Sequence, residues 1–190
     1  MIELALHILD IAENSSRAEA SLIEISIVED TGQDMFSMEI RDNGVGMDAE
    51  MLEKAMDPFF TTKKVRRIGL GLPMLAQAAN TTGGRFFIQS QPGAGTVVRA
   101  EFRHSHIDRQ PLGDVAGSIT ALILGNPDID IVYTHTRNGR AYVLDTREIR
   151  ETLEDVPLNH REVLTLIRDN IREGIEELER SEEAGDTPAA

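Results

Sequence analysis

The segment Asp42-Asn43-Gly44-Val45-Gly46 directly follows an alternating apolar and polar run, Met35–Ile40. This alternation predicts a half-buried strand, so the Asp42 carboxylate is expected at a strand end. A buried, ionised carboxylate is costly unless it accepts hydrogen bonds, and the exocyclic amino group of adenine is a suitable donor. Gly44 and Gly46 lack Cβ, which lets the backbone bend and approach a flat ring. The alternative is an ordinary Asp-Asn-Gly turn between two strands.

Residues 1–20 show the periodicity of an amphipathic helix, and His7, Asp10 and Asn14 fall on one stripe of it. Such a polar stripe is ordinarily the solvated side of a helix. An Asn amide oxygen is, however, also a hard neutral ligand that can complete a Mg²⁺ shell made of waters and phosphate oxygens. Arg17 could reach the same phosphates from this face.

Gly69-Leu70-Gly71-Leu72 opens a predicted helix that runs to about Ala79. Glycine amides at a helix start present N–H donors where the helix dipole favours negative charge, which makes a phosphate seat. A tight loop is the alternative. The segment is neither a P-loop nor a dinucleotide-binding fingerprint, because it lacks Gly-Lys-Ser/Thr and a set of three spaced glycines.

Between these segments, Asp57–Arg67 combines two aromatic and four basic residues, and all three lysines of the chain lie within residues 54–64. A segment with an aromatic anchor and positive charge suits a lid over a triphosphate. A patch for nucleic acid or for an acidic partner is the alternative. The formal net charge of −14 argues against nucleic acid.

Together with Gly93-Ala94-Gly95-Thr96 in a predicted hairpin turn, these segments resemble the ATP-binding module of the GHKL superfamily, the Bergerat fold. DNA gyrase, the heat-shock chaperone ATPases, sensor histidine kinases and mismatch-repair ATPases share this module. The resemblance covers residues 1–103 and is closest to the histidine-kinase branch. The helix around Asn14 is similar to the N box, Asp42–Met47 to the G1 box, Asp57–Lys63 to the F box, Gly69–Leu72 to the G2 box and Gly93–Thr96 to the final glycine box.

The resemblance implies ATP and Mg²⁺ as ligands. Asn14 would coordinate Mg²⁺, Arg17 and Lys63 would contact phosphates, and Asp42 would bind the adenine amino group with support from Thr96. The other expected nucleotide contacts are Gly44, Gly46, Met47, Phe60, Thr62, Gly69, Leu70, Gly71 and Leu72. Asp10 stands where other branches of the superfamily place a Glu general base. It could orient water or a substrate hydroxyl, or act through a magnesium-bound group.

Sensor kinases carry a helical hairpin with a phospho-accepting His before this module, whereas the resemblance here begins at Met1. We therefore expect any phospho-acceptor on an unidentified protein partner. Two functions stay open. One is a histidine-kinase-like kinase or ATPase that passes phosphate to that partner in signalling or regulation. The other is a non-catalytic binding module or switch that reports the ATP or ADP state to the partner.

The composition fits a folded domain or two small ones: 190 residues, 41% hydrophobic, with no apolar run of bilayer length. The absence of Cys excludes disulfides and thiolate metal sites. We expect a cytoplasmic protein whose partners include neither nucleic acid nor membrane. A homodimer stays open.

We expect an α+β fold. Residues 1–103 should form a two-layer α/β sandwich with a mixed sheet and helices on one face. Residues 104–180 should form a small α+β appendage of a helix, a hairpin and further helices, and residues 181–190 a disordered tail. The appendage could pack on the nucleotide module, dimerise or dock a partner.

Within the appendage, Asn138-Gly139 predicts the hairpin turn, and an apolar stripe from Arg161 to about Glu179 predicts the last helix. His135 and Arg137 beside the hairpin are expected to be surface residues, with a contact to a partner as the alternative.

Overall fold

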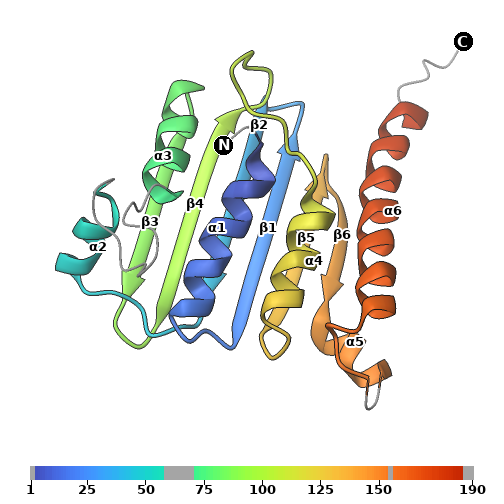
Figure 1. Ribbon diagram of the computed structural model, residues 1–190. Helices are drawn as coiled ribbons and strands as arrows, with labels where there is room; N and C mark the ends of the chain where they lie inside the picture. The colour runs from blue at the N-terminus through green and yellow to red at the C-terminus, as the bar shows by residue number, and fades with distance from the viewer. Residues whose placement is uncertain (1–2, 58–70, 154–155, 186–190) are drawn as a thin grey trace, which may run out of the picture.

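One six-stranded mixed sheet runs through the chain in the order β3-β4-β2-β1-β5-β6 (Figure 1). The computed structural model describes residues 3–57, 71–153 and 156–185. The strands are β1 (Leu22–Asp30), β2 (Met35–Asp42), β3 (Arg85–Gln91), β4 (Gly95–Arg103), β5 (Asp130–Arg137) and β6 (Arg140–Asp145). The helices are α1 (Leu4–Arg17), α2 (Ala49–Ala55), α3 (Gly71–Thr81), α4 (Val115–Gly125), α5 (Thr146–Leu153) and α6 (Arg161–Gly185).

The central strand β1 shows why the sheet has one buried face. Ile23, Ile25 and Ile27 are buried, and the residues between them are more exposed, as the period of a strand requires. β1 pairs antiparallel with β2 and parallel with β5. The predicted α+β fold with a mixed sheet is therefore confirmed.

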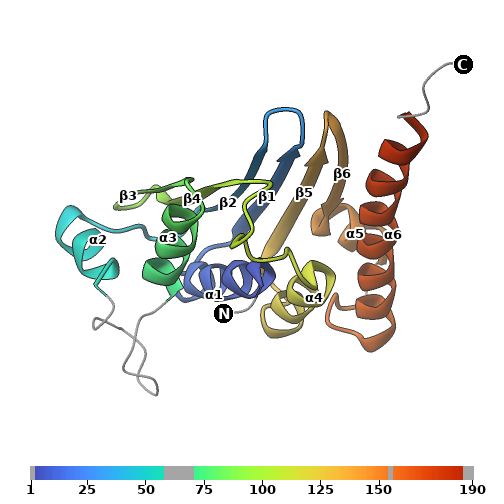
Figure 2. The same ribbon diagram turned by 90° about the horizontal axis from the view of Figure 1, so that it is seen from above.

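Helices α1, α3, α4 and α6 lie on the same face of the sheet (Figures 1 and 2). α1 lies centrally and buries Leu4, Ile8 and Ile11 against the sheet and its neighbours. Its first turn is held by the segment before α4, because the N–H groups of Leu4 and Ala5 donate to carbonyls at positions 111 and 112. α1 is thus fixed at its first turn, and its other end lies near the end of β2.

The C-terminal elements continue the same sheet and core. β5 pairs along β1, and α4 packs against α1 and α6. Residues 104–180 thus pack on residues 1–103, which is one of the three arrangements expected for them. The division at residue 103 into separate domains stays a prediction. α6 extends to Gly185, so residues 181–185 lie in a helix and the predicted disordered tail is corrected there. Residues 186–190 lie outside the described residues.

A buried polar cluster joins β1 to β5, and it corrects our prediction for His135. That side chain is only 1% exposed, and its Nε2 lies 2.8 Å from Oε1 of Glu29. Arg137 donates to Oε2 of the same carboxylate at 3.1 Å, and Nε2 of His104 lies 3.2 Å from it. Because β1 and β5 pair side by side, Glu29 and His135 meet inside the fold, while Arg137 is half-buried at its edge.

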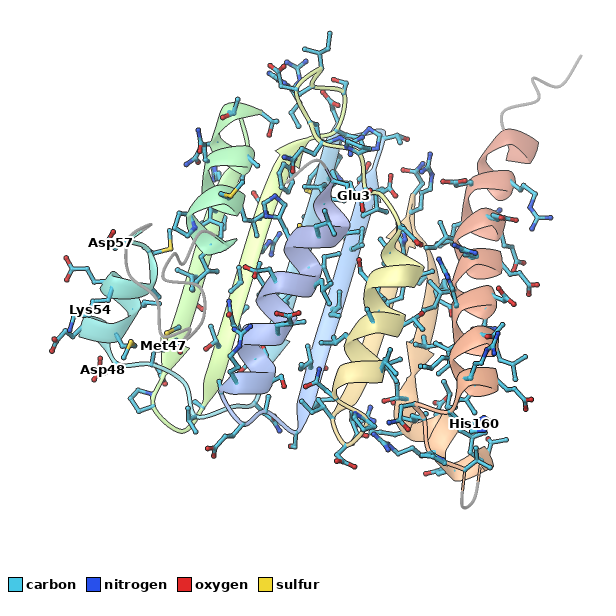
Figure 3. All side chains as sticks on the ribbon, viewed as in Figure 1. Glu3, Met47, Asp48, Lys54, Asp57 and His160 are labelled. Carbon is cyan, nitrogen blue, oxygen red and sulfur yellow. The ribbon has the colours of Figure 1, made fainter. Side chains whose placement is uncertain are left out.

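The short helix α2 lies at the outer end of the molecule, beyond the edge strand β3 (Figure 1). Asp48 caps it by accepting a 2.8 Å hydrogen bond from the N–H of Met51, as expected for an N-cap. No residue of α2 is buried, and Asp48 and Lys54 point away from the sheet (Figure 3). α2 therefore lies outside the hydrophobic core.

Candidate functional site

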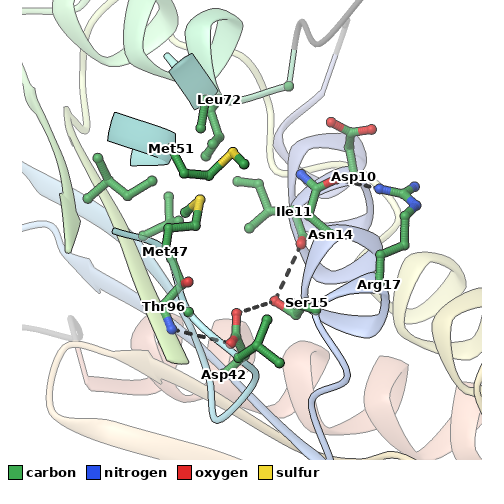
Figure 4. Close-up of a pocket in the computed structure, with 17 residues that line it drawn as sticks. Asp10, Ile11, Asn14, Ser15, Arg17, Asp42, Met47, Met51, Leu72 and Thr96 are labelled. Atoms are coloured by element: carbon green, nitrogen blue, oxygen red, sulfur yellow. Dashed lines mark hydrogen bonds between the residues drawn. The ribbon is translucent and has the colours of Figure 1, made fainter. Parts of the chain in front are cut away.

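A cavity of about 280 Å³ opens between α1, the β2–α2 segment, α2, the start of α3 and strands β3 and β4 (Figure 4). Nine residues proposed from the sequence line it: Asp10, Asn14, Arg17, Asp42, Gly46, Met47, Gly71, Leu72 and Thr96. Residues separated by up to 86 positions thus meet at one site. Phe60, Thr62, Lys63, Gly69 and Leu70 lie outside the described residues, and Gly44 does not line the cavity.

Asp42 forms the polar end of the cavity and is only 8% exposed. Ser15 Oγ donates to its Oδ2 at 2.6 Å, while the N–H groups of Gly44 and Thr96 donate to Oδ1 at 2.9 and 3.2 Å. These donors offset the cost of burying a carboxylate. Since a carboxylate can accept about four hydrogen bonds, Asp42 keeps acceptor capacity for a ligand.

The strand register explains why Thr96 stands next to Asp42. The two residues are direct partners in the antiparallel pair β2–β4, and Thr96 is in turn the partner of Ser90 on β3. Ser90 Oγ lies 2.9 Å from Oγ1 of Thr96 and accepts the N–H of Met47 at 2.8 Å. Asp42, Thr96 and Ser90 therefore form one hydrogen-bonded row across three neighbouring strands, in which Thr96 uses its backbone N–H towards Asp42 and its hydroxyl towards Ser90.

The glycines after Asp42 are required by the loop itself. A Cβ on Gly46 would lie 1.9 Å from the carbonyl oxygen of Gln91, and its φ of +67° favours glycine as well. A Cβ on Gly44 would lie 2.4 Å from the carbonyl oxygen of Ala18. From the sequence, these glycines were expected to let the backbone approach a flat ring. The structure gives a different reason, which is close packing of the loop on α1 and on the β3–β4 hairpin.

Asn14 and Arg17, both in α1, form the open side of the cavity. Arg17 donates from Nη1 to Oδ1 of Asn14 at 2.5 Å (Figure 4). It also donates from Nη2 to Glu13 at 3.0 Å. The predicted polar stripe divides in two, because Asp10 and Asn14 line the cavity while His7 is buried and contacts Gln110. An amide oxygen and a guanidinium group thus face the same opening.

Asp10 lies against the first residue of α3. A Cβ on Gly71 would come within 1.8 Å of Oδ2 of Asp10, so a larger residue at this helix start would require the Asp10 carboxylate to turn away. The start of α3 is also where the helix dipole favours anions. Asp10, Asn14 and Gly71 therefore surround the end of the cavity that suits negatively charged groups with a bound cation.

The walls between these polar ends are apolar. Ile11 contributes from α1, Met47 and Met51 from the segment around α2, Leu72 from α3 and Ile88 from β3. Such walls suit a flat heteroaromatic ring, because apolar side chains can cover both of its faces. Sequence analysis did not assign these residues apart from Met47 and Leu72, since nothing separates them from ordinary core positions.

The residues around the cavity suit a magnesium ion that enters bound to a ligand better than an ion held by protein side chains alone. No group of three or more His, Cys, Asp or Glu side chains able to hold a metal occurs among residues 3–57, 71–153 and 156–185. Mg²⁺ keeps waters and is commonly held by one or two side chains plus substrate phosphates, which is what Asn14 and Asp10 offer.

In the same described part of the chain, no helix is both long and apolar enough to cross a membrane.

In a comparison with known families, residues 2–106 match the family described as histidine kinase-, DNA gyrase B- and HSP90-like ATPase. Among curated proteins, the chain is 33% identical over 110 residues to the sensor kinase CckA of Brucella abortus (strain 2308). The match spans 50% of this chain and 12% of that protein. A putative sensor protein of Shewanella frigidimarina (strain NCIMB 400) is 39% identical over 79 residues, which is 40% of this chain and 12% of that protein.

Among solved structures, the N-terminal domain of a DNA repair protein superposes with a TM-score of 0.50 at 15% identity. The superposition covers 76% of this chain and 53% of that one. This likeness concerns the fold alone. The chain spans about an eighth of the length of the two curated sensor proteins it matches.

Proposed function

The chain belongs to the family of histidine kinase-, DNA gyrase B- and HSP90-like ATPases, and on this premise we propose that it binds Mg-ATP and passes phosphate to a protein partner. The observation that carries the proposal is the cavity that ends at Asp42. It joins a buried acceptor, apolar walls and a cation-compatible opening in one site. The proposed setting is signalling or regulation in the cytoplasm, as for a histidine-kinase-like module.

In this proposal the adenine ring enters between Ile11, Met47 and Ile88. Its exocyclic amino group donates to the acceptor position of Asp42 that the three protein donors leave open. The phosphates extend towards Arg17 and the start of α3, where N–H groups and the dipole favour anions. Asn14 would hold Mg²⁺, which would supply charge neutralisation at the phosphate oxygens.

Five further residues belong to this proposal from the sequence. Phe60, Thr62 and Lys63 would form the lid over the triphosphate, and Gly69 and Leu70 would complete the phosphate seat that begins at Gly71. Gly44 would act indirectly, since its N–H group donates to Asp42 at 2.9 Å.

Asp10 is the residue that we propose to act on the nucleophile. Its carboxylate lies at the phosphate end of the cavity, against Gly71. From there it can orient water or a partner's hydroxyl by accepting its proton, or hold a water bound to the metal ion. Both roles need the carboxylate and not merely its shape.

A second candidate function, a nucleotide-dependent switch, is favoured by one contact. Ser16 Oγ donates to Oδ1 of Asn126, which follows α4, while the adjacent Ser15 donates to Asp42. Neighbouring residues of α1 therefore touch the cavity and the C-terminal elements. A shift of α1 on nucleotide binding would therefore also move the C-terminal elements, and no phosphate transfer would be needed.

The experiment uses ATP labelled at the γ-phosphate and proteins retained by the chain in the presence of Mg-ATP. Transfer of label to a retained protein, lost in an Asp10→Asn variant that still binds ATP, supports the kinase. Retention that depends on ATP with no label transferred supports the switch. Absence of ATP binding by the wild-type chain would refute both.

A further inference from the structure

The Ser90 hydroxyl has three polar neighbours, and only one arrangement of protons satisfies all of them. It accepts the N–H of Met47 at 2.8 Å, donates to the carbonyl oxygen of Gly95 at 3.0 Å and lies 2.9 Å from Oγ1 of Thr96. A serine hydroxyl has a single proton and two lone pairs. A carbonyl oxygen cannot donate, so the proton of Ser90 goes to Gly95. All three contacts are hydrogen bonds at once only if Thr96 donates to Ser90.

This arrangement fixes the character of Thr96 towards the cavity. Because its proton is used by Ser90, Oγ1 of Thr96 offers only lone pairs to a ligand. Asp42 beside it is also an acceptor, with Oδ1 and Oδ2 already receiving hydrogen bonds from Thr96, Gly44 and Ser15. The polar end of the cavity therefore presents acceptors without a hydroxyl donor.

We infer that Ser90 is a positioning residue that makes the site selective for 6-amino over 6-oxo purines, by holding the Thr96 hydroxyl as an acceptor. The inference rests on the proposed nucleotide function and concerns its specificity. A 6-amino group donates to acceptors at this end of the cavity. A 6-oxo group places an acceptor against acceptors, and such an unpaired polar contact is strongly disfavoured.

Ser90 acts on the base without touching it. It stands outside the residues that line the cavity, one strand beyond Thr96 in the β3–β4 pair. It also ties the loop at Met47 to the hairpin turn at Gly95, so its loss would release two backbone groups as well as Thr96. A purely structural role would weaken all nucleotides equally, whereas the inferred role changes the preference among them.

The test compares the dissociation constants of Mg-ATP and Mg-ITP by calorimetric titration. ITP carries a 6-oxo group in place of the 6-amino group and a hydrogen on N1, and it otherwise keeps the ring, the sugar and the phosphates. In Ser90→Ala, Thr96 is free to turn its proton to the 6-oxo group, so the ratio of the ITP to the ATP dissociation constant should fall by about tenfold. Ser90→Thr keeps the hydroxyl and should restore the ratio. Ser26 lies in β1 on the face opposite to the buried isoleucines, so Ser26→Ala should leave the ratio unchanged.

A second variant covers the case in which Ser90→Ala does not fold. Thr96→Val keeps the backbone N–H bond to Asp42 but removes the acceptor, so it should lower the same ratio. In the double variant, Ser90→Ala should add no further loss of preference. A wild-type ratio in Ser90→Ala that still binds ATP, or in Thr96→Val, would overturn the inference and leave the proposed function standing. A wild-type chain that binds neither nucleotide would contradict the proposed function itself.

Discussion

Ser15 Oγ lies 2.6 Å from Oδ2 of Asp42, so a residue near the end of α1 holds the carboxylate of the last residue of β2. Both side chains are buried, at 3% and 8% exposure. The contact joins the helix that carries Asn14 and Arg17 to the strand that carries the base-binding acceptor. The two ends of the proposed nucleotide site are therefore fixed relative to each other before any ligand arrives.

Removing this contact should weaken ATP binding without abolishing it. In Ser15→Ala the carboxylate keeps its two backbone donors but loses the bond that orients Oδ2. We expect about fivefold weaker ATP binding and a loss of about 1 kcal/mol of stability. Titration with ATP and urea unfolding measure the two effects, with Ser26→Ala as the matched serine control. An affinity equal to that of the wild type would show that the orientation of Asp42 does not depend on Ser15.

Asn14→Ala should remove the advantage that magnesium gives to ATP binding. The wild-type chain should bind ATP more tightly with Mg²⁺ than with a chelator present, because the Asn14 amide oxygen adds a ligand to the ion. The variant should bind similarly in both conditions. Glu13→Ala is the control, since Glu13 is exposed on the same helix and does not line the cavity. A magnesium effect of wild-type size in Asn14→Ala would rule out this role.

Two glycines with similar backbone angles separate conformational strain from a clash. Gly46 and Gly93 have φ of +67° and +76°, but only at Gly46 would a Cβ meet backbone, at 1.9 Å from the oxygen of Gln91. Gly93→Ala should cost only the left-handed strain, about 1–2 kcal/mol. Gly46→Ala should cost clearly more and should also weaken ATP binding. Equal unfolding free energies for the two variants would contradict the close packing of this loop.

Glu29 should make stability depend on pH in the acid range. Burial raises the pKa of Glu29, but the hydrogen bonds from His135 and His104 and the charges of His135 and Arg137 outweigh it, so the pKa falls from 4.5 to about 2. A folded-state pKa below the unfolded one means that the stabilisation is complete above pH 4.5 and is lost as the pH falls towards 2.

The measurement is the difference in unfolding free energy between the wild type and Glu29→Gln. At neutral pH the charge can contribute up to about 3 kcal/mol, and this contribution should shrink between pH 4.5 and about pH 3. Glu24→Gln, on the exposed side of β1, serves as the control. A difference that stays constant over this range would mean that the Glu29 carboxylate is not stabilised by its partners.

The sequence predicted those parts of the site whose signal is local. Asp42 was expected at a strand end, and β2 ends there; Asn14 was expected late in a helix, and α1 carries it. The turn residues likewise predicted the hairpins that form the pairs β3–β4 and β5–β6. These patterns depend only on residues a few positions apart.

What the sequence did not predict depends on contacts between distant segments. Ser15 looked like one more small polar residue of a helix, and its role exists only because α1 meets a carboxylate 27 positions away. Ser90 depends on the β3–β4 register in the same way. The parallel pairing of β1 with β5 has no local signal either, because parallel strands are joined by long connections. His135 was therefore expected on a surface that this pairing buries.

The most direct test of the account is calorimetric titration of Mg-ATP into the wild type and into Asp42→Ala, with thermal unfolding to verify that both are folded. We expect binding by the wild type and a loss of affinity of about 100-fold or more in the variant, because the charged acceptor for the base is gone. ATP binding of wild-type strength in a folded Asp42→Ala variant would contradict the account.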